Sequence, residues 1–226
     1  MTEDRRLTGF ALHIIAMLLM LTDHLRFAFP DARLWLFAVG RLAFPIFAFL
    51  TAEGIKHTRD VKKYALRLLA LAVSAEIPFD LLSSGTFIAP GHQNVIWTLL
   101  LSVITVSIIK KYADRAWVCG IAAAAAFIIA EISRTDYGGF GVMTVFFFYF
   151  LDGETKRDRL ALVLGIAFVN LSLAVLDSAP IQLFALLALP VIFLYDGRRG
   201  CHGRAVRLLF YGFYPAHLLA VWALTV

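Results

Sequence analysis

Residues 8–29, TGFALHIIAMLLMLTDHLRFAF, give the clearest indication of the fold class of this chain. Its apolar run is long enough to cross a bilayer, and a short polar, basic segment precedes it. No small-residue cleavage site follows, so we expect a retained helix rather than a signal peptide. Of the 226 residues, 61% are hydrophobic and only 16% are charged. A soluble globular domain is much more polar, so we expect one integral membrane domain over residues 1–226.

Further apolar segments follow this first one, and together they predict about nine transmembrane helices. The segments run at about 8–29, 34–55, 61–82, 95–109, 116–132, 140–151, 160–176, 181–195 and 206–225. The sixth is short for a bilayer, so a tilt in thinned lipid, an extension through Gly138 and Gly139, or a re-entrant path would each fit. The sequence therefore predicts an all-α, polytopic transmembrane helical bundle.

Basic residues alternate between the connections of these segments. Basic side chains precede the first segment and fill every even-numbered connection: Arg5, Arg6, Lys56, Arg59, Lys62, Lys63, Lys110, Lys111, Arg115, Lys156, Arg157, Arg159, Arg198, Arg199, Arg204 and Arg207. The odd-numbered connections hold little beyond Arg26, Arg33 and Arg134. The positive-inside rule then places the N-terminus in the cytoplasm and the C-terminus outside, in a multi-pass inner-membrane protein. Membrane orientation explains the net charge of +5, and we expect no nucleic-acid partner.

Ionisable and amide side chains interrupt these apolar segments at a similar depth. Such groups are costly in hydrocarbon, so each is a candidate for function. Asp23 and His24 lie roughly 24 Å along the first segment, and Arg41 lies about 10 Å inward from the outer end of the second. The residues expected at this level are Asp23, His24, Arg41, Glu76, Asn94, Thr98 and Glu131. If their helices converge, these residues form a site in the outer layer of the membrane.

Proton transfer is the chemistry that this set favours. His24 titrates near neutrality, and a carboxylate can fix its tautomer and raise its basicity. Arg41 could hold a carboxylate or an oxyanion. The alternative is structural: Arg41 would only neutralise Asp23 or Glu76, and His24 would be a hydrogen-bonding partner. Asp80 shares a helix face with Glu76 around a kink at Pro78, or it marks the interfacial end of that helix.

A second group of polar residues lies on the expected cytoplasmic side. Its cations and tyrosines could bind the phosphates and stack the base of a nucleotide-like ligand. The group comprises Glu53, His57, Lys62, Lys63, Tyr64, Arg67, Arg198, Arg199, Tyr211, Tyr214 and His217. Cations that set topology, together with an aromatic belt at the interface, would give the same pattern. We expect no metal, because Glu53 and His57 lack further ligands.

Five motifs carry a resemblance to a known family. They are LLMLTDH at 18–24, GRLAFPIFAFLTAEGIKHT at 40–58, KYALRLLALAVSAEIPFD at 63–80, YDGRRG at 195–200 and FYGFYPAHLL at 210–219. In this order they are similar to the TraX family of membrane acetyltransferases, while residues 113–175 match by hydropathy more than by signature. TraX proteins of conjugative plasmids are associated with acetylation of the pilin N-terminus. The resemblance therefore implies an acetyl-CoA-dependent transferase whose acceptor is a pilin-like peptide, a glycan or a lipid.

The resemblance also implies roles for the two groups of residues. The basic, aromatic group would bind cytoplasmic acetyl-CoA, and the acetyl group would reach Asp23, His24, Arg41, Glu76 and Asn94. We expect His24 to take the acceptor's proton, with Asp23 or Glu76 orienting it and Arg41 or Asn94 stabilising the oxyanion. An acetyl-His24 intermediate is the alternative route.

Two other classes of function stay open at this point. A small-molecule or proton-coupled transporter would also carry intramembrane ionisable groups, although no internal repeat supports one. A non-catalytic assembly factor for conjugation or pilus subunits would need only apolar packing, which leaves the ionisable set unexplained.

Overall fold

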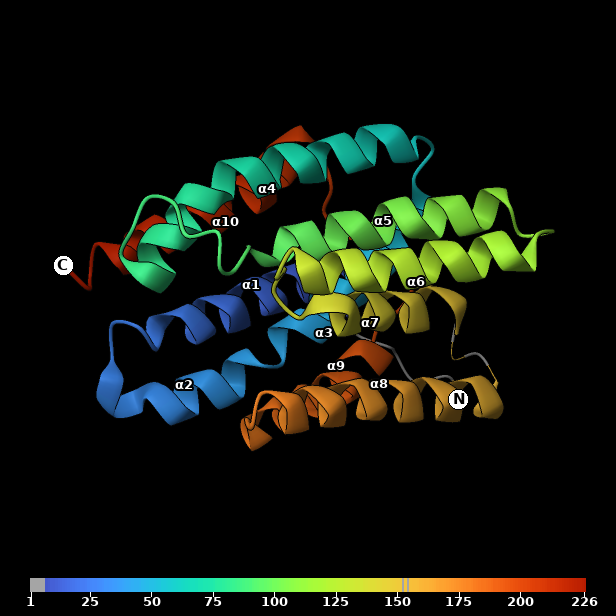
Figure 1. Cartoon of the computed structure of the whole chain (residues 1–226). Coiled ribbons are helices and arrows are strands. Elements are labelled where there is room, and N and C mark those ends of the chain that lie inside the picture. The colour runs from blue at the N-terminus through green and yellow to red at the C-terminus, as the bar shows by residue number, and fades with distance from the viewer. Residues whose placement is uncertain (1–6, 152, 154) are drawn as a thin grey trace. The chain divides into compact units, whose positions relative to one another are not determined.

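The computed structural model of this chain describes residues 7–151, 153 and 155–226. Over these residues the chain is helical and no strand forms, so the predicted all-α class is confirmed. The elements, drawn in Figure 1, are α1 (Gly9–Leu25), η1 (Pro30–Ala32), α2 (Arg33–Gly40), α3 (Ala43–His57), α4 (Val61–Ser84), α5 (Val95–Lys111), α6 (Ala116–Ile132), α7 (Gly138–Phe150), α8 (Lys156–Leu176), η2 (Pro180–Leu187), α9 (Ala188–Phe193) and α10 (Arg204–Trp222). Each predicted segment coincides with one or two of these elements.

The second predicted segment, 34–55, is not one continuous helix. Helix α2 ends at Gly40 and α3 begins at Ala43, so Arg41 lies at the break. Pro45 has no N–H group, and its ring would clash with the carbonyl four residues earlier, which is that of Arg41. The break therefore follows from the proline, and it places a cation where regular helical hydrogen bonding is interrupted.

The eighth predicted segment, 181–195, is also irregular. It forms the 3₁₀ helix η2 followed by the short helix α9. Pro190 lies inside α9 and cannot donate a hydrogen bond to the carbonyl four residues before it. A proline at this position explains why no regular α-helix runs through the whole segment.

The chain divides into two compact units, and each is described by itself. Unit 1 comprises the described part of Met1–Leu50 together with Asn170–Val226, and unit 2 comprises Thr51–Val169. In unit 1, α1 packs against α2 and α10, and η2 packs against α2 and α9. In unit 2, α5 packs against α4, α6 and α7. The expectation of one domain over residues 1–226 stays a prediction.

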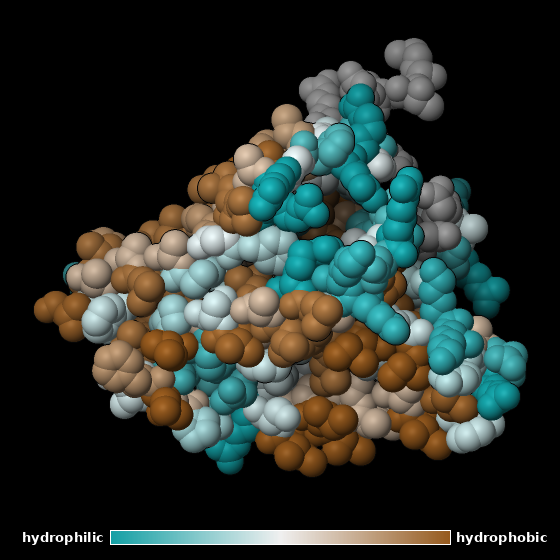
Figure 2. Space-filling model, turned by 90° about the horizontal axis from the view of Figure 1, so that it is seen from above, coloured by the Kyte–Doolittle hydropathy of each residue, from teal (hydrophilic) through white to brown (hydrophobic). Residues whose placement is uncertain are grey.

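Large apolar side chains cover much of the surface that the structure describes. Trp35 in α2 and Ile132 in α6 are 75% and 76% exposed, and Figure 2 shows broad hydrophobic areas on the visible face. Within the described residues, two helical segments, Pro30–His57 and Lys156–Leu176, are long and apolar enough to cross a membrane. Broad exposed apolar areas mark surfaces that contact lipid or protein. The number of crossings and the orientation of the termini stay predictions.

Candidate functional site

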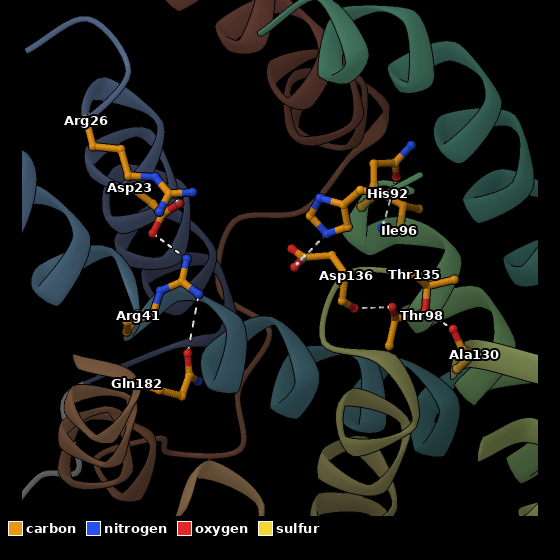
Figure 3. Close-up of polar contacts among 11 residues, drawn as sticks. Asp23, Arg26, Arg41, His92, Ile96, Thr98, Ala130, Thr135, Asp136 and Gln182 are labelled. Atoms are coloured by element: carbon orange, nitrogen blue, oxygen red, sulfur yellow. Dashed lines mark hydrogen bonds and ion pairs between the residues drawn. The ribbon is translucent and has the colours of Figure 1, made fainter. Parts of the chain in front are cut away.

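A buried ion pair forms where α1 and α2 both end, in unit 1. Arg41 Nη2 donates to Asp23 Oδ1 at 2.6 Å, and Arg26 Nε lies 3.7 Å from Asp23 Oδ2. Asp23 is only 7% exposed. Figure 3 shows the Asp23 carboxylate between the guanidinium groups of Arg26 and Arg41. The pairing of Asp23 with Arg41 that the structural alternative predicted is therefore present, and Arg26 is an addition that sequence reasoning missed.

Arg41 also links this pair to a chain of amide side chains. Its Nη1 donates to Gln182 Oε1 at 3.3 Å, as Figure 3 shows. Gln182 Nε2 in turn donates to Asn170 Oδ1 at 2.8 Å. Gln182 in η2 and Asn170 in α8 are both buried. Buried polar groups are usually hydrogen-bonded. The two hydrogen bonds through Gln182 and Asn170 therefore hold the guanidinium of Arg41 through Nη1, while Nη2 contacts the carboxylate of Asp23.

Phe37 and Gly40 shape the surroundings of the pair. The guanidinium carbons of Arg26 and Arg41 lie 4.2 Å and 4.3 Å from the centroid of the Phe37 ring, within the range of cation–π attraction. A Cβ added to Gly40 would lie 2.6 Å from the Cα of Asp23. Helix α2 can therefore approach the carboxylate this closely only with glycine at position 40.

His24, next to Asp23 in α1, contacts a second histidine from the last helix. Its Nδ1 lies 2.9 Å from His217 Nε2, and His217 Nδ1 lies 2.9 Å from the Phe213 carbonyl oxygen. His217 is 5% exposed. Sequence alone predicts His217 in the coenzyme group, but the structure places it against His24, some thirteen residues along α10 from Arg204. His24 and His217 therefore belong to one site.

Glu76 and Asn94 meet in unit 2. Glu76 Oε2 accepts hydrogen bonds from Asn94 Nδ2 and, at 2.7 Å, from Trp97 Nε1. Asn94 Nδ2 also donates to the Ala72 carbonyl at 2.9 Å, and Asn94 Oδ1 caps α5 by accepting from Ile96 N at 3.0 Å. Asn94 is fully buried. These two predicted residues thus lie together and join α4 to the start of α5.

Two carboxylate oxygens in α4 are buried with no hydrogen-bond partner in the described part of the chain. They are Glu76 Oε1 and Asp80 Oδ1. The other oxygen of Asp80 accepts from Ala89 N at 2.8 Å, so Asp80 holds the loop that follows α4. This contact favours the structural interpretation of Asp80 over a role beside Glu76.

Glu131 and Thr98, expected at the same level, make structural contacts within unit 2. Glu131 Oε1 accepts from Gly139 N at 2.8 Å and thereby caps the start of α7. Thr98 Oγ1 donates to the Asp136 carbonyl at 2.5 Å, and His92 Nε2 lies 3.5 Å from the Asp136 carboxylate. Figure 3 shows His92, Thr98 and Asp136 in this arrangement. These contacts tie the loops before α5 and α7 to each other.

The basic residues after α3 belong to unit 2 and make local contacts. Lys63 pairs with Asp60 at 3.3 Å, with its side chain 75% exposed, and the Arg67 guanidinium lies 5.7 Å from the Tyr64 ring centroid. Lys62 is exposed too. Glu53 and His57 contact each other at 3.7 Å on the last turn of α3.

The YDGRRG loop, residues 195–200, lies in unit 1 against the start of α1. The carbonyl oxygens of Arg198 and Arg199 accept from Gly9 N and Phe10 N at 2.8 Å and 2.9 Å. The first N–H groups of a helix have no partner within it, so this loop caps α1. Arg198 also pairs with Asp196 at 2.6 Å, and its hydrogen bonds lower the pKa of Asp196.

The family of the chain can be assigned from its sequence as a whole. The model of the TraX protein family matches residues 8–225. The chain belongs to the TraX family. The resemblance that the five motifs predicted is therefore confirmed.

Two relatives of this TraX-family chain align over nearly its whole length. It is 29% identical over 245 residues to the protein named probable fimbrial assembly protein FimC, serogroup H1, of Dichelobacter nodosus, and 96% of each chain is aligned. It is 25% identical over 220 residues to the protein named TraX of Escherichia coli, with 93% of this chain and 84% of that protein aligned. No solved structure matches the chain significantly.

The catalytic residues predicted for this TraX-family protein fall into two sets. Asp23, His24 and Arg41 gather in unit 1, while Glu76 and Asn94 gather in unit 2. A single chamber that holds all five stays a prediction. In the residues that the structure describes, no three His, Cys, Asp or Glu side chains gather in a way that could hold a metal ion.

Two signals in the sequence could have identified the residues that sequence reasoning missed. Asn170 and Gln182 are amides inside apolar segments, which is the same anomaly that identified Asp23 and Asn94. Arg26 follows Asp23 by one helical turn, a spacing at which side chains meet.

Proposed function

We propose that this chain is an acetyltransferase of the inner membrane that moves an acetyl group from cytoplasmic acetyl-CoA to an amine or hydroxyl acceptor. One observation carries the proposal: His24, which contacts a second histidine, directly follows Asp23, whose buried carboxylate is held by Arg41. A base next to a fixed ion pair in a largely apolar helix supports proton transfer. Ionisable groups are costly in such a helix, so a role in packing alone is less favoured.

The residues of unit 1 would divide the chemistry among them. The acceptor nitrogen or oxygen attacks the thioester carbonyl carbon, and His24 takes the proton that the acceptor loses. Arg41 is the cation of the cluster that lies closest to Asp23, and its charge would stabilise the oxyanion. When the carbon–sulfur bond breaks, the proton on His24 passes to the departing thiolate. Glu76 and Asn94 keep their predicted supporting roles as part of the proposal.

The acyl donor would be bound at the basic ends of the helices. Arg198 and Arg199 lie against the start of α1 in unit 1, and Lys62, Lys63, Tyr64 and Arg67 follow α3 in unit 2. Guanidinium and ammonium groups suit the phosphates of coenzyme A. Gly9 and His24 are about 22 Å apart along α1, so the pantetheine arm would extend from the loop toward the histidine.

A multi-pass membrane arrangement is supported by three observations. Large apolar side chains such as Trp35 are exposed, and two helical segments have the length and composition of membrane spans. Within unit 1, His13 stacks on Phe210 and His24 contacts His217, so α1 and α10 run in the same direction. Parallel first and last helices agree with an odd number of crossings, the cytoplasmic N-terminus and the outer C-terminus.

The names of the relatives point to the acceptor. One relative is named a probable fimbrial assembly protein, which fits the association of TraX proteins with pilin acetylation. We therefore place the N-terminus of a pilin-like peptide first among the acceptors, before a glycan or a lipid of the cell envelope.

The experiment uses the full-length protein in lipid nanodiscs with acetyl-CoA labelled in the acetyl group. We expect label to pass to a peptide with a free N-terminus and coenzyme A to be released. His24→Ala should reduce this rate on the order of 100-fold, the contribution of a general base, while acetyl-CoA binding persists. His92→Ala is the matched control, because this exposed histidine lies in a loop of unit 2 and its removal should leave the rate unchanged.

Three outcomes, from this assay and from an uptake assay, separate the competing functions. Activity of His24→Ala within a few-fold of the wild-type rate would remove His24 from the proposed role. If the wild-type protein acetylates no peptide, glycan or lipid, the assembly-factor function is favoured. Uptake of a solute into proteoliposomes without acetyl-CoA would favour a transporter.

A further inference from the structure

The two histidines of unit 1 form a directional chain of hydrogen bonds. His217 Nδ1 lies 2.9 Å from the Phe213 carbonyl oxygen, and a carbonyl oxygen only accepts hydrogen bonds. The hydrogen of a neutral His217 ring must therefore be on Nδ1. Its Nε2 then carries a lone pair and can only accept.

The tautomer of His24 follows from the tautomer of His217. His24 Nδ1 lies 2.9 Å from His217 Nε2, so His24 Nδ1 must be the donor. We infer that His217 is a positioning residue that fixes His24 in the Nδ1–H tautomer and makes Nε2 the basic nitrogen of His24. This inference rests on the proposed function only where it concerns the proton of the acceptor.

The surroundings of His217 suit this role. Its ring stacks on Phe213 with centroids 4.8 Å apart and planes 11° apart, and the Tyr214 ring centroid lies 5.6 Å away. Burial to 5% exposure removes the competition of water for its ring nitrogens. A ring held by packing and by a backbone carbonyl has one orientation, so it can impose one tautomer on its neighbour.

The same contact would serve both protonation states of His24. In the neutral state Nδ1–H donates to His217, and the Nε2 lone pair takes the proton from the acceptor. In the resulting imidazolium both nitrogens carry hydrogen, so the Nδ1–H donation to His217 persists without a rearrangement. The arrangement therefore needs no movement of either ring during proton transfer.

The tautomer can be measured without any enzymatic assay. The experiment uses full-length protein in nanodiscs with ¹⁵N-labelled histidine, at a pH where the rings are neutral, and assigns His24 by the signals lost in His24→Ala. We expect a protonated Nδ1 and an unprotonated Nε2 for His24 in the wild type. In His217→Phe, which keeps an aromatic ring but has no acceptor, His24 should shift to the Nε2–H tautomer that free histidine prefers in water. His217→Gln, whose amide oxygen can accept, should restore the Nδ1–H form.

The activity of the same variants tests the functional part. We expect His217→Phe to lower kcat at least about tenfold, a share of the general-base contribution, with acetyl-CoA binding unchanged and with partial rescue in His217→Gln. An Nε2–H tautomer in the wild type would overturn the inference whatever the activity, and so would a wild-type kcat in His217→Phe. Should His217→Phe not fold, the wild-type spectrum alone decides. A wild type with the expected tautomer but no acetyl transfer would instead overturn the proposed function.

Discussion

Gly40 and Asp23 approach so closely that a Cβ on Gly40 would lie 2.6 Å from the Cα of Asp23. The contact is with backbone, so no side-chain rotation can relieve it. The position of the Asp23 carboxylate, which holds Arg41, therefore requires glycine at position 40 of α2.

Gly40→Ala should consequently push α2 away from α1 and destabilise the protein. Overpacking of this kind costs about 1–3 kcal/mol, which we expect as a lower melting temperature in detergent and a lower rate of acetyl transfer. Gly120→Ala in α6 is the matched control, because a Cβ there meets nothing within 4 Å. That variant should match or exceed wild-type stability, since alanine favours helix over glycine by up to about 1 kcal/mol. Equal melting temperatures for the two variants would contradict the close contact.

The Asp23–Arg41 pair should behave as a buried ion pair rather than a surface one. Arg41→Ala removes the closer of the two cations at Asp23 and leaves only the 3.7 Å contact with Arg26, which we expect to cost about 3 kcal/mol in the free energy of unfolding, the low end for breaking a buried pair. The double variant with Asp23→Ala should recover part of that loss, since the poorly compensated buried carboxylate is then removed too. Denaturant titration of both single variants and the double variant measures the coupling.

The exposed pair of Lys63 and Asp60 provides the comparison for that cycle. Lys63→Ala should change the free energy of unfolding by no more than about 0.5 kcal/mol, as for other surface ion pairs. Additive effects of the Asp23 and Arg41 substitutions would show that the two side chains are not coupled.

The basic residues should matter for the acyl donor and not for the fold. We expect Lys63→Ala and Arg199→Ala each to weaken acetyl-CoA binding about tenfold, the loss of one charge-assisted contact of roughly 1.4 kcal/mol, with unchanged melting temperature. Equilibrium binding of labelled acetyl-CoA to nanodiscs gives the affinity. Lys110→Ala, in another basic connection, is the control and should bind normally. Wild-type affinity in both variants would show that these residues only set the membrane topology and do not bind acetyl-CoA.

Arg198 is less suitable for that test, because it has a structural partner. Arg198→Ala is also expected to weaken acetyl-CoA binding, but it removes the ion pair with Asp196 and allows the pKa of that carboxylate to rise toward its ordinary value. A depressed carboxylate pKa stabilises the fold above the unfolded-state pKa and loses this contribution as the pH falls. The variant should therefore lose less stability than the wild type on acidification, measured as melting temperature against pH.

Cys201 reports the orientation of the chain in the membrane. It is exposed in the loop between α9 and α10, whereas Cys119 is half-buried. A membrane-impermeant maleimide should label Cys201 in inverted vesicles and not in intact spheroplasts, and Cys201→Ser should remove this label. Ser83→Cys in the Cys201→Ser background should react in spheroplasts instead, because the third connection is expected outside. Labelling from the opposite sides would reverse the predicted topology.

The helical class, the approximate positions of the helices and the family could all be predicted from the amino-acid sequence. Long apolar runs bounded by polar residues specify helices through local composition, and costly polar groups in those runs, such as Asp23, His24 and Asn94, identify themselves. The break at Arg41 also has a local cause, Pro45, although the segment predicted over 34–55 was continuous.

Which of these polar groups contact each other could be learned from helix packing alone. His24 and His217 are 193 residues apart in the chain and Arg41 and Gln182 are 141 apart, and no local pattern encodes such pairs. His217 is therefore predicted among the coenzyme residues from sequence, although packing of α10 beside α1 brings it to His24. Hydrophobic patterning fixes which face of a helix is apolar, but the partner of a buried polar group depends on helix packing and on the direction of its hydrogen bonds.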